Sequence, residues 1–491
     1  MNTMTLMVAI VLLAGVLLAR ANKRFGFPAL ISFVAVGSAL ASLVPGVLEN
    51  ITPKVAKDLS YLALAFILFE GGLHTSARRV QRVWRPAMSL ATIGVLISSA
   101  IMTGFAHMVL GISWVPAAML GVAASSTDAA SVFSVLGNTS LRRRLTDVLE
   151  VESGTNDPMS FFLITILMQW IHQPHLSISE EIGRVIVLFC LEMAVGLVIG
   201  VVIGLLASYV NRYVKLDTGG LYPTLSLGFA LLSFGLAQSL YGSGFLAVYV
   251  TGVVMSSRQM EHRYTIVRFH EGLAWTMHVL MFVVLGFFLV PRDFAYVFVP
   301  GVALAAAALL VARPVAVWIS TIGMRFTIRE RAFIAWAGLR GAAPIVLILS
   351  AVESEVTGYI VMIEVVFFIV IASTLIQGLT VQPLSEKFDL VDATPSEDIV
   401  DLLSLTRETA LVVPVEIAAD SPYVEKRLSE VRFPENTLCY GVVRGSRVVV
   451  PRGSTRLRVG DHLLVIAEMS QVAALKAMFD KDQVGQATML P

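Results

Sequence analysis

The chain has 491 residues, of which 56% are apolar and only 14% are charged, against about 45–50% and about 25% in an ordinary soluble domain. This excess excludes a water-soluble globular protein and indicates a membrane protein. The 36 basic and 35 acidic residues nearly cancel, which excludes a nucleic-acid binder, and two cysteines, Cys190 and Cys439, are too few for a disulfide framework or a CxxC metal site.

Apolar windows long enough to cross a bilayer core of about 30 Å follow one another up to Pro383. The first has no basic segment before it and no small-residue cleavage site, so we expect it to be a retained span. We predict thirteen spans, near residues 4–19, 28–44, 57–73, 86–109, 114–136, 145–172, 182–211, 221–241, 243–257, 270–290, 297–322, 330–351 and 357–383.

Loop charges support this number independently, because cytoplasmic loops of membrane proteins accumulate Lys and Arg. The loops after odd-numbered spans contain 18 basic residues, and those after even-numbered spans contain four, Lys54, Lys57, Arg184 and Arg292. The alternation predicts a multi-pass protein with its N-terminus outside and its C-terminus in the cytoplasm.

Two predicted spans are interrupted near the middle by small or helix-breaking residues around one charge. The fifth contains Thr127 and Asp128, and the twelfth contains Arg340 between two glycines with Pro344 after it. Paired interruptions of this kind indicate inverted repeats with crossed broken helices and an ion site at the midplane. Asp128 would then suit a positive helix end and Arg340 a negative one, although close helix packing would also explain the small residues.

The sixth span contains a polar cluster in an apolar surrounding. It holds Glu152, Ser153, Asn156, Asp157 and Pro158, and an ionised group in the bilayer costs at least ~2.5–3.5 kcal/mol. Ser153 and Asp157, four apart, share a helix face, whereas Glu152 and Asp157, five apart, point in different directions. We expect irregular backbone near Pro158 that lines a cavity, and the alternative is that Asp157 caps a broken helix.

Two further charges lie at membrane depth. Arg313 in the eleventh span has no oppositely charged neighbour in the sequence, and Glu152 is the partner that we predict for it, in a structural ion pair. Glu70 lies at the cytoplasmic end of the third span, where it either faces the interface or the ion path.

The character of the chain changes after Pro383. Residues 384–405 are polar and acidic and are predicted to be a linker, and residues 406–491 are predicted to be a small cytoplasmic α+β domain. Its expected strands are TALVVPVEI, NTLCYGVV, SRVVVP and DHLLVIAE, and its expected helices are SPYVEKRLSEV and MSQVAALKAMF. The arginines of the hairpin around Gly445 are either solvated strand residues or a phosphate site, and no GxGxxG fingerprint opens the domain.

The buried carboxylates predict exchange of a proton for a cation. A low-dielectric surrounding favours the neutral, protonated form of a carboxylate, whereas a bound cation favours the charged form. If such a site opens to one side at a time, the competition produces antiport. Hard oxygen ligands suit alkali ions, but spacing alone does not distinguish Na⁺ from K⁺.

The motifs ESGTNDP at Glu152, TDAA at Thr127, FEGGL at Glu70, ARP at Arg313 and GLRGAAP at Arg340 together resemble the NhaP-type branch of the monovalent cation:proton antiporters, over nearly all of residues 1–383. The resemblance implies an α-helical polytopic protein of the bacterial cytoplasmic membrane with crossed discontinuous helices, working as a homodimer. It also implies electroneutral exchange, because the family's Asn-Asp pair differs from the two-carboxylate pair of electrogenic relatives.

The same resemblance assigns roles by position. Asp157 would carry the ion or proton, and Asp128, Thr127 and Ser153 would line the site with Asn156 orienting it. Glu70 corresponds to an additional acidic group near the ion in some members. Glu152 with Arg313 matches the structural pair, and Arg340 matches the charged crossing helix.

The tail, with GSTRLRVGDHLLVIAE, is similar to the TrkA-C subdomain of potassium-conductance regulators. Antiporters with this tail resemble potassium/proton exchangers, so we predict K⁺/H⁺ antiport with no cofactor and, as alternatives, Na⁺/H⁺ antiport or a potassium channel. The channel is disfavoured because no TVGYG-type filter occurs, and an enzyme because no catalytic set appears. The resemblance also implies a small regulatory ligand such as cyclic di-AMP on the tail.

Overall fold

The structure is a computed structural model and describes residues 9–18, 29–43, 52–137, 139, 141–172, 178–258, 260–289, 294–353, 359–391, 410–418, 421–434, 437–445, 447–468 and 471–479. It divides into two compact units, a helical unit (Met1–Leu390) and a sheet unit (Val391–Pro491). The predicted linker lies almost wholly outside the described residues.

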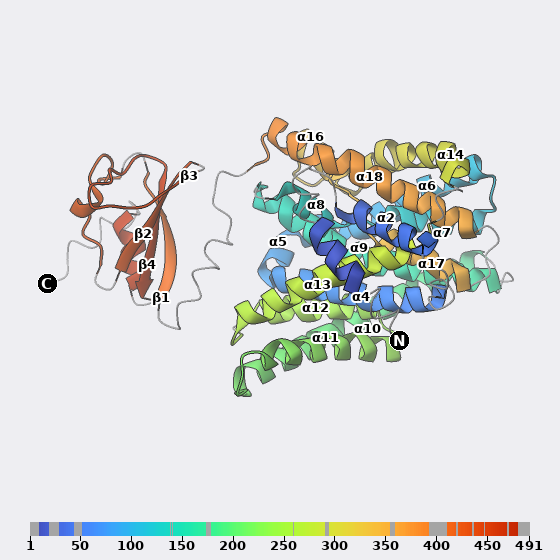
Figure 1. Ribbon diagram of the computed structural model, residues 1–491, viewed down its shortest axis with the longest axis horizontal. Helices are drawn as coiled ribbons and strands as arrows, with labels where there is room; N and C mark the ends of the chain where they lie inside the picture. The colour runs from blue at the N-terminus through green and yellow to red at the C-terminus, as the bar shows by residue number, and fades with distance from the viewer. Residues whose placement is uncertain are drawn as a thin grey trace. The chain divides into compact units, whose positions relative to one another are not determined.

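The helical unit is built from apolar helices joined by short connections (Figure 1). Its described elements are a helix over Ala9–Leu18, α2 (Ala29–Leu43), α4 (Pro53–His74), α5 (Ala77–Ser89), η1 (Leu90–Gly94), α6 (Val95–Leu110), α7 (Trp114–Ser125), α8 (Ala129–Leu136), α9 (Arg143–His172), α10 (Ile178–Tyr213), α11 (Leu221–Ser239), α12 (Gly244–Ser256), α13 (Arg263–Gly286), α14 (Phe294–Ala307), η2 (Ala308–Ala312), α15 (Arg313–Ser320), α16 (Ile328–Trp336), α17 (Ala343–Glu353) and α18 (Tyr359–Lys387).

Within the described residues every predicted span is helical, apart from the breaks at 126–128 and 337–342. Seven helical segments there are long and apolar enough to cross a membrane, and three further apolar helices are shorter. The number of thirteen crossings stays a prediction. The expectation of irregular backbone near Pro158 was wrong: α9 continues through Pro158, so Asp157 does not cap a broken helix either. Residues 154–162 are all buried, so neighbouring helices enclose this part of α9.

The helices pack around a core of small and apolar residues. In the segment Trp114–Leu136, 72% of the most apolar window is buried, against 17% in Gly183–Tyr213, so α7 and α8 lie at the centre and α10 at the periphery. α4 and α12 lie side by side (Figure 1) and approach closely at Gly72 and Gly252, where a Cβ on Gly252 would lie 2.6 Å from the carbonyl oxygen of Phe69. Small residues permit such close approach between membrane helices.

Several arginines in or next to the connections, among them Arg142, Arg144, Arg325 and Arg329, lie at one end of the helical unit, which we call the arginine-rich end. Arg144 Nη1 donates to the Arg325 carbonyl at 2.6 Å, and Arg142 Nη2 donates to the Asp389 carbonyl at 2.8 Å. The backbone N–H of Ala77 donates to Ser257 Oγ at 2.8 Å. The first two contacts join the start of α9 to the α15–α16 connection and to the end of α18, and the third joins the start of α5 to the end of α12.

The sheet unit is a four-stranded antiparallel sheet in the order β1-β4-β2-β3, with α20 (Val472–Phe479) packed on it. Its strands are β1 (Ala410–Glu416), β2 (Thr437–Arg444), β3 (Arg447–Val449) and β4 (Asp461–Glu468). The predicted strands, the hairpin and the last helix are confirmed.

The first predicted tail helix was wrong. Residues 422–430 form turns and the short 3-10 helix η3 (Leu428–Glu430). Backbone bonds from Glu425 N to the Leu457 carbonyl (2.8 Å) and from Leu428 N to the Thr455 carbonyl (2.8 Å) replace helical ones. A helix this short is marginal alone, so pairing with the 453–457 segment prevails.

Candidate functional site

Two interrupted helix pairs cross inside the helical unit. α7 ends at Ser125 and α8 begins at Ala129, while α16 ends at Trp336 and α17 begins at Ala343. The extended segments between them meet in a backbone hydrogen bond of 2.7 Å from Asp128 N to the Leu339 carbonyl. The sequence prediction of crossed, interrupted helices therefore agrees with the geometry.

Each crossing segment places its charged residue at a helix end of opposite polarity. Asp128 caps α8 by accepting from Ala130 N (3.0 Å) and Ser131 N (3.3 Å), so its carboxylate lies at a positive end. Arg340, fully buried, donates from Nε to the Ala124 carbonyl near the end of α7 at 2.6 Å. The hydrogen bonds to Asp128 offset part of the cost of a charge at membrane depth. Arg340 is only partly satisfied, because its Nη1 and Nη2 are buried without a hydrogen bond among the described residues.

α9 passes the crossing and supplies the remaining polar groups. Asp157 Oδ1 accepts from Ser126 Oγ at 2.5 Å, and Asn156 Nδ2 donates to Thr127 Oγ1 at 2.6 Å. These four side chains are buried. Because α7 stops at Ser125, the hydroxyls of the extended segment face α9 instead of bonding within a helix.

The site also includes Ser153, whose Oγ accepts from Ala129 N at 3.2 Å. Asn156 Oδ1 is buried and has no hydrogen-bond partner among the described residues. An enclosed carboxylate with hydroxyl and amide oxygens around it can hold a proton or a hard monovalent cation.

Glu152 points away from this cluster and contacts Arg313. Two hydrogen bonds join them, Nη1 to Oε1 at 2.6 Å and Nη2 to Oε2 at 3.0 Å, and both side chains are buried. Arg313 directly follows the π-helical turn η2, and the backbone at Gly338 lies against its side chain. The pair thus links α9 and α15 beside the crossing, and its structural role remains a prediction.

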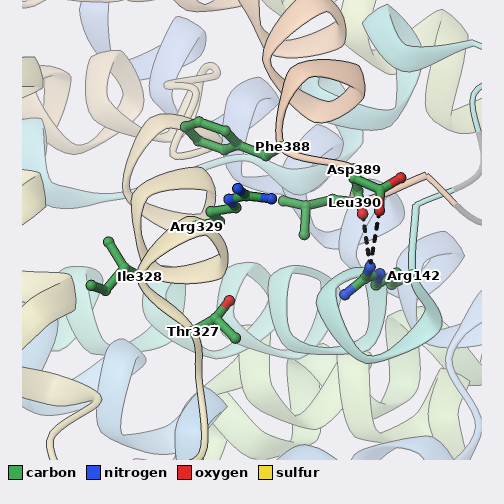
Figure 2. Close-up of a pocket in the computed structure, with 7 residues that line it drawn as sticks. All are labelled: Arg142, Thr327, Ile328, Arg329, Phe388, Asp389 and Leu390. Atoms are coloured by element: carbon green, nitrogen blue, oxygen red, sulfur yellow. Dashed lines mark hydrogen bonds and ion pairs between the residues drawn. The ribbon is translucent and has the colours of Figure 1, made fainter.

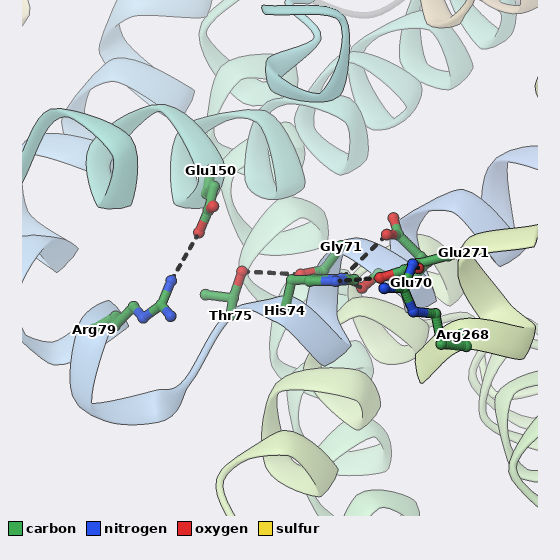
Figure 3. A network of polar contacts seen from close by, with 8 residues as sticks. All are labelled: Glu70, Gly71, His74, Thr75, Arg79, Glu150, Arg268 and Glu271. Carbon is green, nitrogen blue, oxygen red and sulfur yellow. Dashed lines mark hydrogen bonds and ion pairs between the residues drawn. The ribbon is translucent and has the colours of Figure 1, made fainter. Parts of the chain in front are cut away.

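Glu70 belongs to a different cluster at the arginine-rich end (Figure 3). Its Oε1 lies 3.1 Å from His74 Nδ1, and His74 Nε2 lies 3.2 Å from Glu271 Oε1. Arg268 Nη1 donates to Glu271 Oε2 at 3.2 Å. Of the predicted site residues, the structure therefore gathers Asp157, Asp128, Thr127, Ser153, Asn156 and Arg340 at the crossing, and it places Glu70 elsewhere.

Sequence reasoning missed Ser126, the donor to Asp157. Its signal was the run Ser125-Ser126-Thr127-Asp128, in which each hydroxyl borders the interruption. It also left Glu150 and Tyr249 unassigned.

A separate pocket of about 390 Å³ opens at the arginine-rich end (Figure 2). It is lined by Arg142, Thr327, Ile328, Arg329, Phe388, Asp389 and Leu390. Arg142 is held by Asp389, with 3.9 Å between Nη2 and Oδ2. Two guanidiniums at its wall make this pocket unsuited to a cation.

Family comparison agrees with this geometry. Residues 8–387 match the model of the transmembrane sodium/hydrogen exchanger family, and residues 412–480 match the TrkA-C domain. The chain belongs to the sodium/hydrogen exchanger family and is a multi-pass membrane protein with a TrkA-C domain.

Among its curated relatives is the K(+)/H(+) antiporter NhaP2 of Shewanella baltica, 32% identical over 98% of this chain and 83% of that protein. The K(+)/H(+) antiporter NhaP of Alkalimonas amylolytica is 29% identical over 96% and 82% of the two chains. The Na(+)/H(+) antiporter NhaS2 of Synechocystis is 25% identical over 82% and 74%.

Among solved structures, the sodium proton antiporter MjNhaP1 of Methanocaldococcus jannaschii shares the fold. Its TM-score is 0.65 at 22% identity, with 79% of this chain and 99% of that chain covered.

Proposed function

We propose that this protein is an electroneutral K⁺/H⁺ antiporter that exchanges the two ions at Asp157 by alternating access. The observation that carries the proposal is the buried Asp157 carboxylate, surrounded by hydroxyl and amide groups where two interrupted helix pairs cross. The cation and the proton are both substrates, and their exchange makes and breaks no covalent bond of a substrate, which distinguishes a transporter from an enzyme.

The charge at the crossing supports a ratio of one to one. Three carboxylates (Asp128, Glu152, Asp157) and two guanidiniums (Arg313, Arg340) lie there, with a formal charge of −1. One proton or one monovalent cation neutralises the cluster, and an unneutralised charge is costly at this depth. Each half-cycle therefore moves one positive charge, in opposite directions, and the exchange is electroneutral.

Competition between the proton and the cation for the Asp157 carboxylate couples the two fluxes. In the protonated state the Asp157 carboxyl is neutral and binds no cation, and in the charged state it binds one. Asn156 holds Thr127 in place, and the half-helix ends of α7 and α8 provide dipoles on either side of the crossing. Movement of the crossing relative to the other helices would expose Asp157 to alternate sides.

K⁺ is favoured by the two relatives described as K(+)/H(+) antiporters, which align over nearly the whole chain including the TrkA-C domain. Na⁺ is the alternative substrate, favoured by the more distant NhaS2 relative. We further propose that cyclic di-AMP or a similar small ligand acts on the sheet unit.

We propose that the arginine-rich end faces the cytoplasm across the bacterial inner membrane, because basic residues accumulate in cytoplasmic loops. In this proposal the N-terminus lies outside and the C-terminus inside. A homodimer follows from the family resemblance, and mass measurement of the purified protein in detergent tests it.

Proteoliposomes with an internal pH dye test the function. Separate titrations with K⁺, Na⁺ and Li⁺, with and without a protonophore, should give dequenching at lower K⁺ than Na⁺ concentration. A response to Na⁺ and Li⁺ with none to K⁺ would retain the site and overturn the choice of ion. No response to any of the three would contradict antiport itself.

A further inference from the structure

One face of α9 connects the crossing with the arginine-rich end. Asp147, Glu150, Gly154 and Asp157 are spaced by three, four and three residues, which places them within an arc of about 80° of a regular helix. Glu150 and Asp157 are about 10 Å apart along the helix axis. Two carboxylates therefore lie one above the other on the face that carries the proposed ion site.

Tyr249 of α12 covers this face midway between the two carboxylates. A Cβ on Gly154 would lie 2.5 Å from Cε2 of the Tyr249 ring, so the ring lies directly on the backbone there. Tyr249 is 5% exposed, and its hydroxyl has no hydrogen-bond partner among the described residues. The Thr75 side chain is the neighbour close enough to approach hydrogen-bonding distance of this hydroxyl, and the Glu150 carboxylate acts on it electrostatically.

The hydrogen-bonding capacity of the Glu150 carboxylate is only partly satisfied. Its Oε2 is buried without a hydrogen bond among the described residues, and it lies 3.8 Å from Arg79 Nη1 (Figure 3). The other charged groups near it are Asp147 on α9 and the pair Glu70 and His74 on α4.

Two residues of α13 also belong to this region. Glu271 contacts His74, and Arg268 donates a hydrogen bond to Glu271. His74 lies between the carboxylates of Glu70 and Glu271, which favour its protonated form. Four carboxylates therefore face two guanidiniums and one imidazolium in this region, and its formal charge is −1. A region of this sign concentrates cations.

We propose that Glu150 is a second binding position for the transported cation, on the arginine-rich side of Asp157, and that the Tyr249 ring is the barrier between the two. This inference rests on the proposed antiport at Asp157. A cation at Glu150 moves to Asp157 when the ring is displaced from Gly154, and the Tyr249 hydroxyl is its oxygen ligand during the passage.

Sidedness tests the role of Glu150. Exchange by wild type and Glu150→Gln is measured in everted and right-side-out membrane vesicles, with K⁺ titrated on the outer surface of each. The variant should need about tenfold more K⁺ for half-maximal exchange from the arginine-rich side, and an unchanged concentration from the other side. Glu192→Gln, which removes a half-buried carboxylate on α10, is the matched control and should behave as wild type from both sides.

If Glu150→Gln changes the half-saturating K⁺ concentration equally from both sides, or from neither side, the assignment of Glu150 is overturned. Absence of K⁺-driven exchange by the wild type in both vesicle types would instead overturn the proposed function.

Two substitutions test the barrier. Tyr249→Phe keeps the ring and removes the hydroxyl, so it should lower the maximal exchange rate without a leak. Tyr249→Ala removes the ring and should allow K⁺ flux without a matching H⁺ flux, measured by a potassium electrode and a pH dye in the same vesicles. Tight coupling in Tyr249→Ala, in protein with the wild-type melting temperature, would overturn the barrier role.

Discussion

Glu152 and Asp157 show how two carboxylates on one helix take different roles. They are five residues apart, about 140° around the helix axis. Glu152 contacts the permanently charged Arg313 in two hydrogen bonds, whereas Asp157 contacts the neutral Ser126 hydroxyl. A buried carboxylate held by a guanidinium in two hydrogen bonds of 2.6 and 3.0 Å cannot exchange its partner easily, so of these two carboxylates Asp157 is the one suited to exchange.

Asp157→Asn should abolish exchange and leave folding intact. The amide keeps the shape of the side chain and a hydrogen bond with Ser126, but it neither releases a proton nor carries the charge that attracts a cation. The measurement is dequenching in proteoliposomes together with the melting temperature in detergent. Asp389→Asn, at an exposed carboxylate, is the control, and wild-type exchange in Asp157→Asn would refute the site.

Glu152→Gln should reduce stability by about 3–5 kcal/mol, because Arg313 would remain buried and unpaired. Thermal unfolding of the purified protein measures the loss. The double variant Glu152→Leu with Arg313→Met removes both charges and should recover most of the stability. A Glu152→Gln protein that is as stable as wild type but inactive would show that the pair serves transport instead.

At the scale of elements, the crossing depends on the lack of a side chain at Gly341. A Cβ there would collide with the Asp128 carboxylate, which caps α8. Gly341→Ala should therefore displace the cap, costing about 1–3 kcal/mol, and slow exchange. Gly71→Ala is the matched control because nothing lies within 4 Å of its Cβ position, and equal exchange rates in the two variants would contradict the expected role of the crossing.

The pairing of β2 with β4 includes a buried ionic contact. Asp461 accepts from Arg444 Nε and Nη2, both at 2.8 Å, and from Arg458 N at 2.8 Å. Burial acts to raise the pKa of the Asp461 carboxyl, but the hydrogen bonds and charges of Arg444 and Arg458 hold this pKa below its ordinary value. The contact therefore stabilises the fold fully above the unfolded-state pKa of about 3.9, and the stabilisation is lost as pH falls through the folded-state pKa.

Hydrogen exchange of residues 437–468 in the full-length protein tests this dependence. Protection in wild type should fall below about pH 4, after correction for intrinsic exchange rates. In Asp461→Asn the amides of these residues should be less protected from hydrogen exchange at pH 7, and their protection should change less on acidification. The same pH dependence in both proteins would contradict a contribution from Asp461.

These elements also show what the sequence can predict. Interruptions at Thr127 and Arg340 and the strand alternation of the tail are local signals, and the structure has those breaks and strands. The hydrogen bond from Asp128 to Leu339 and the cover of Gly154 by Tyr249 join segments far apart in the chain. Neither contact leaves a local pattern in the sequence. The helix expected at 421–431 failed for the same reason, because this segment pairs with residues 453–457, which are distant in the sequence.

In the whole molecule, the two units differ in what they contain. The helical unit holds Asp157, the crossing and the Glu150 region, whereas the sheet unit has its own apolar core around Leu463 and Val465. A unit with its own core and none of the ion-site residues is suited to control exchange and not to perform it.

A chain ending at Leu390 should therefore retain K⁺/H⁺ exchange with the half-saturating K⁺ concentration of the full-length protein. Every carboxylate and guanidinium of the crossing remains, and Arg142 N still donates to the Leu390 carbonyl at 2.9 Å, which closes the arginine-rich end. Dequenching in proteoliposomes is compared for the truncated and full-length proteins, with full-length Asp157→Asn as the background. If the truncated protein melts at the same temperature but does not exchange, the sheet unit takes part in transport itself. If exchange persists and a ligand such as cyclic di-AMP changes the rate of the full-length protein alone, control resides in the sheet unit and the site needs only the helical one.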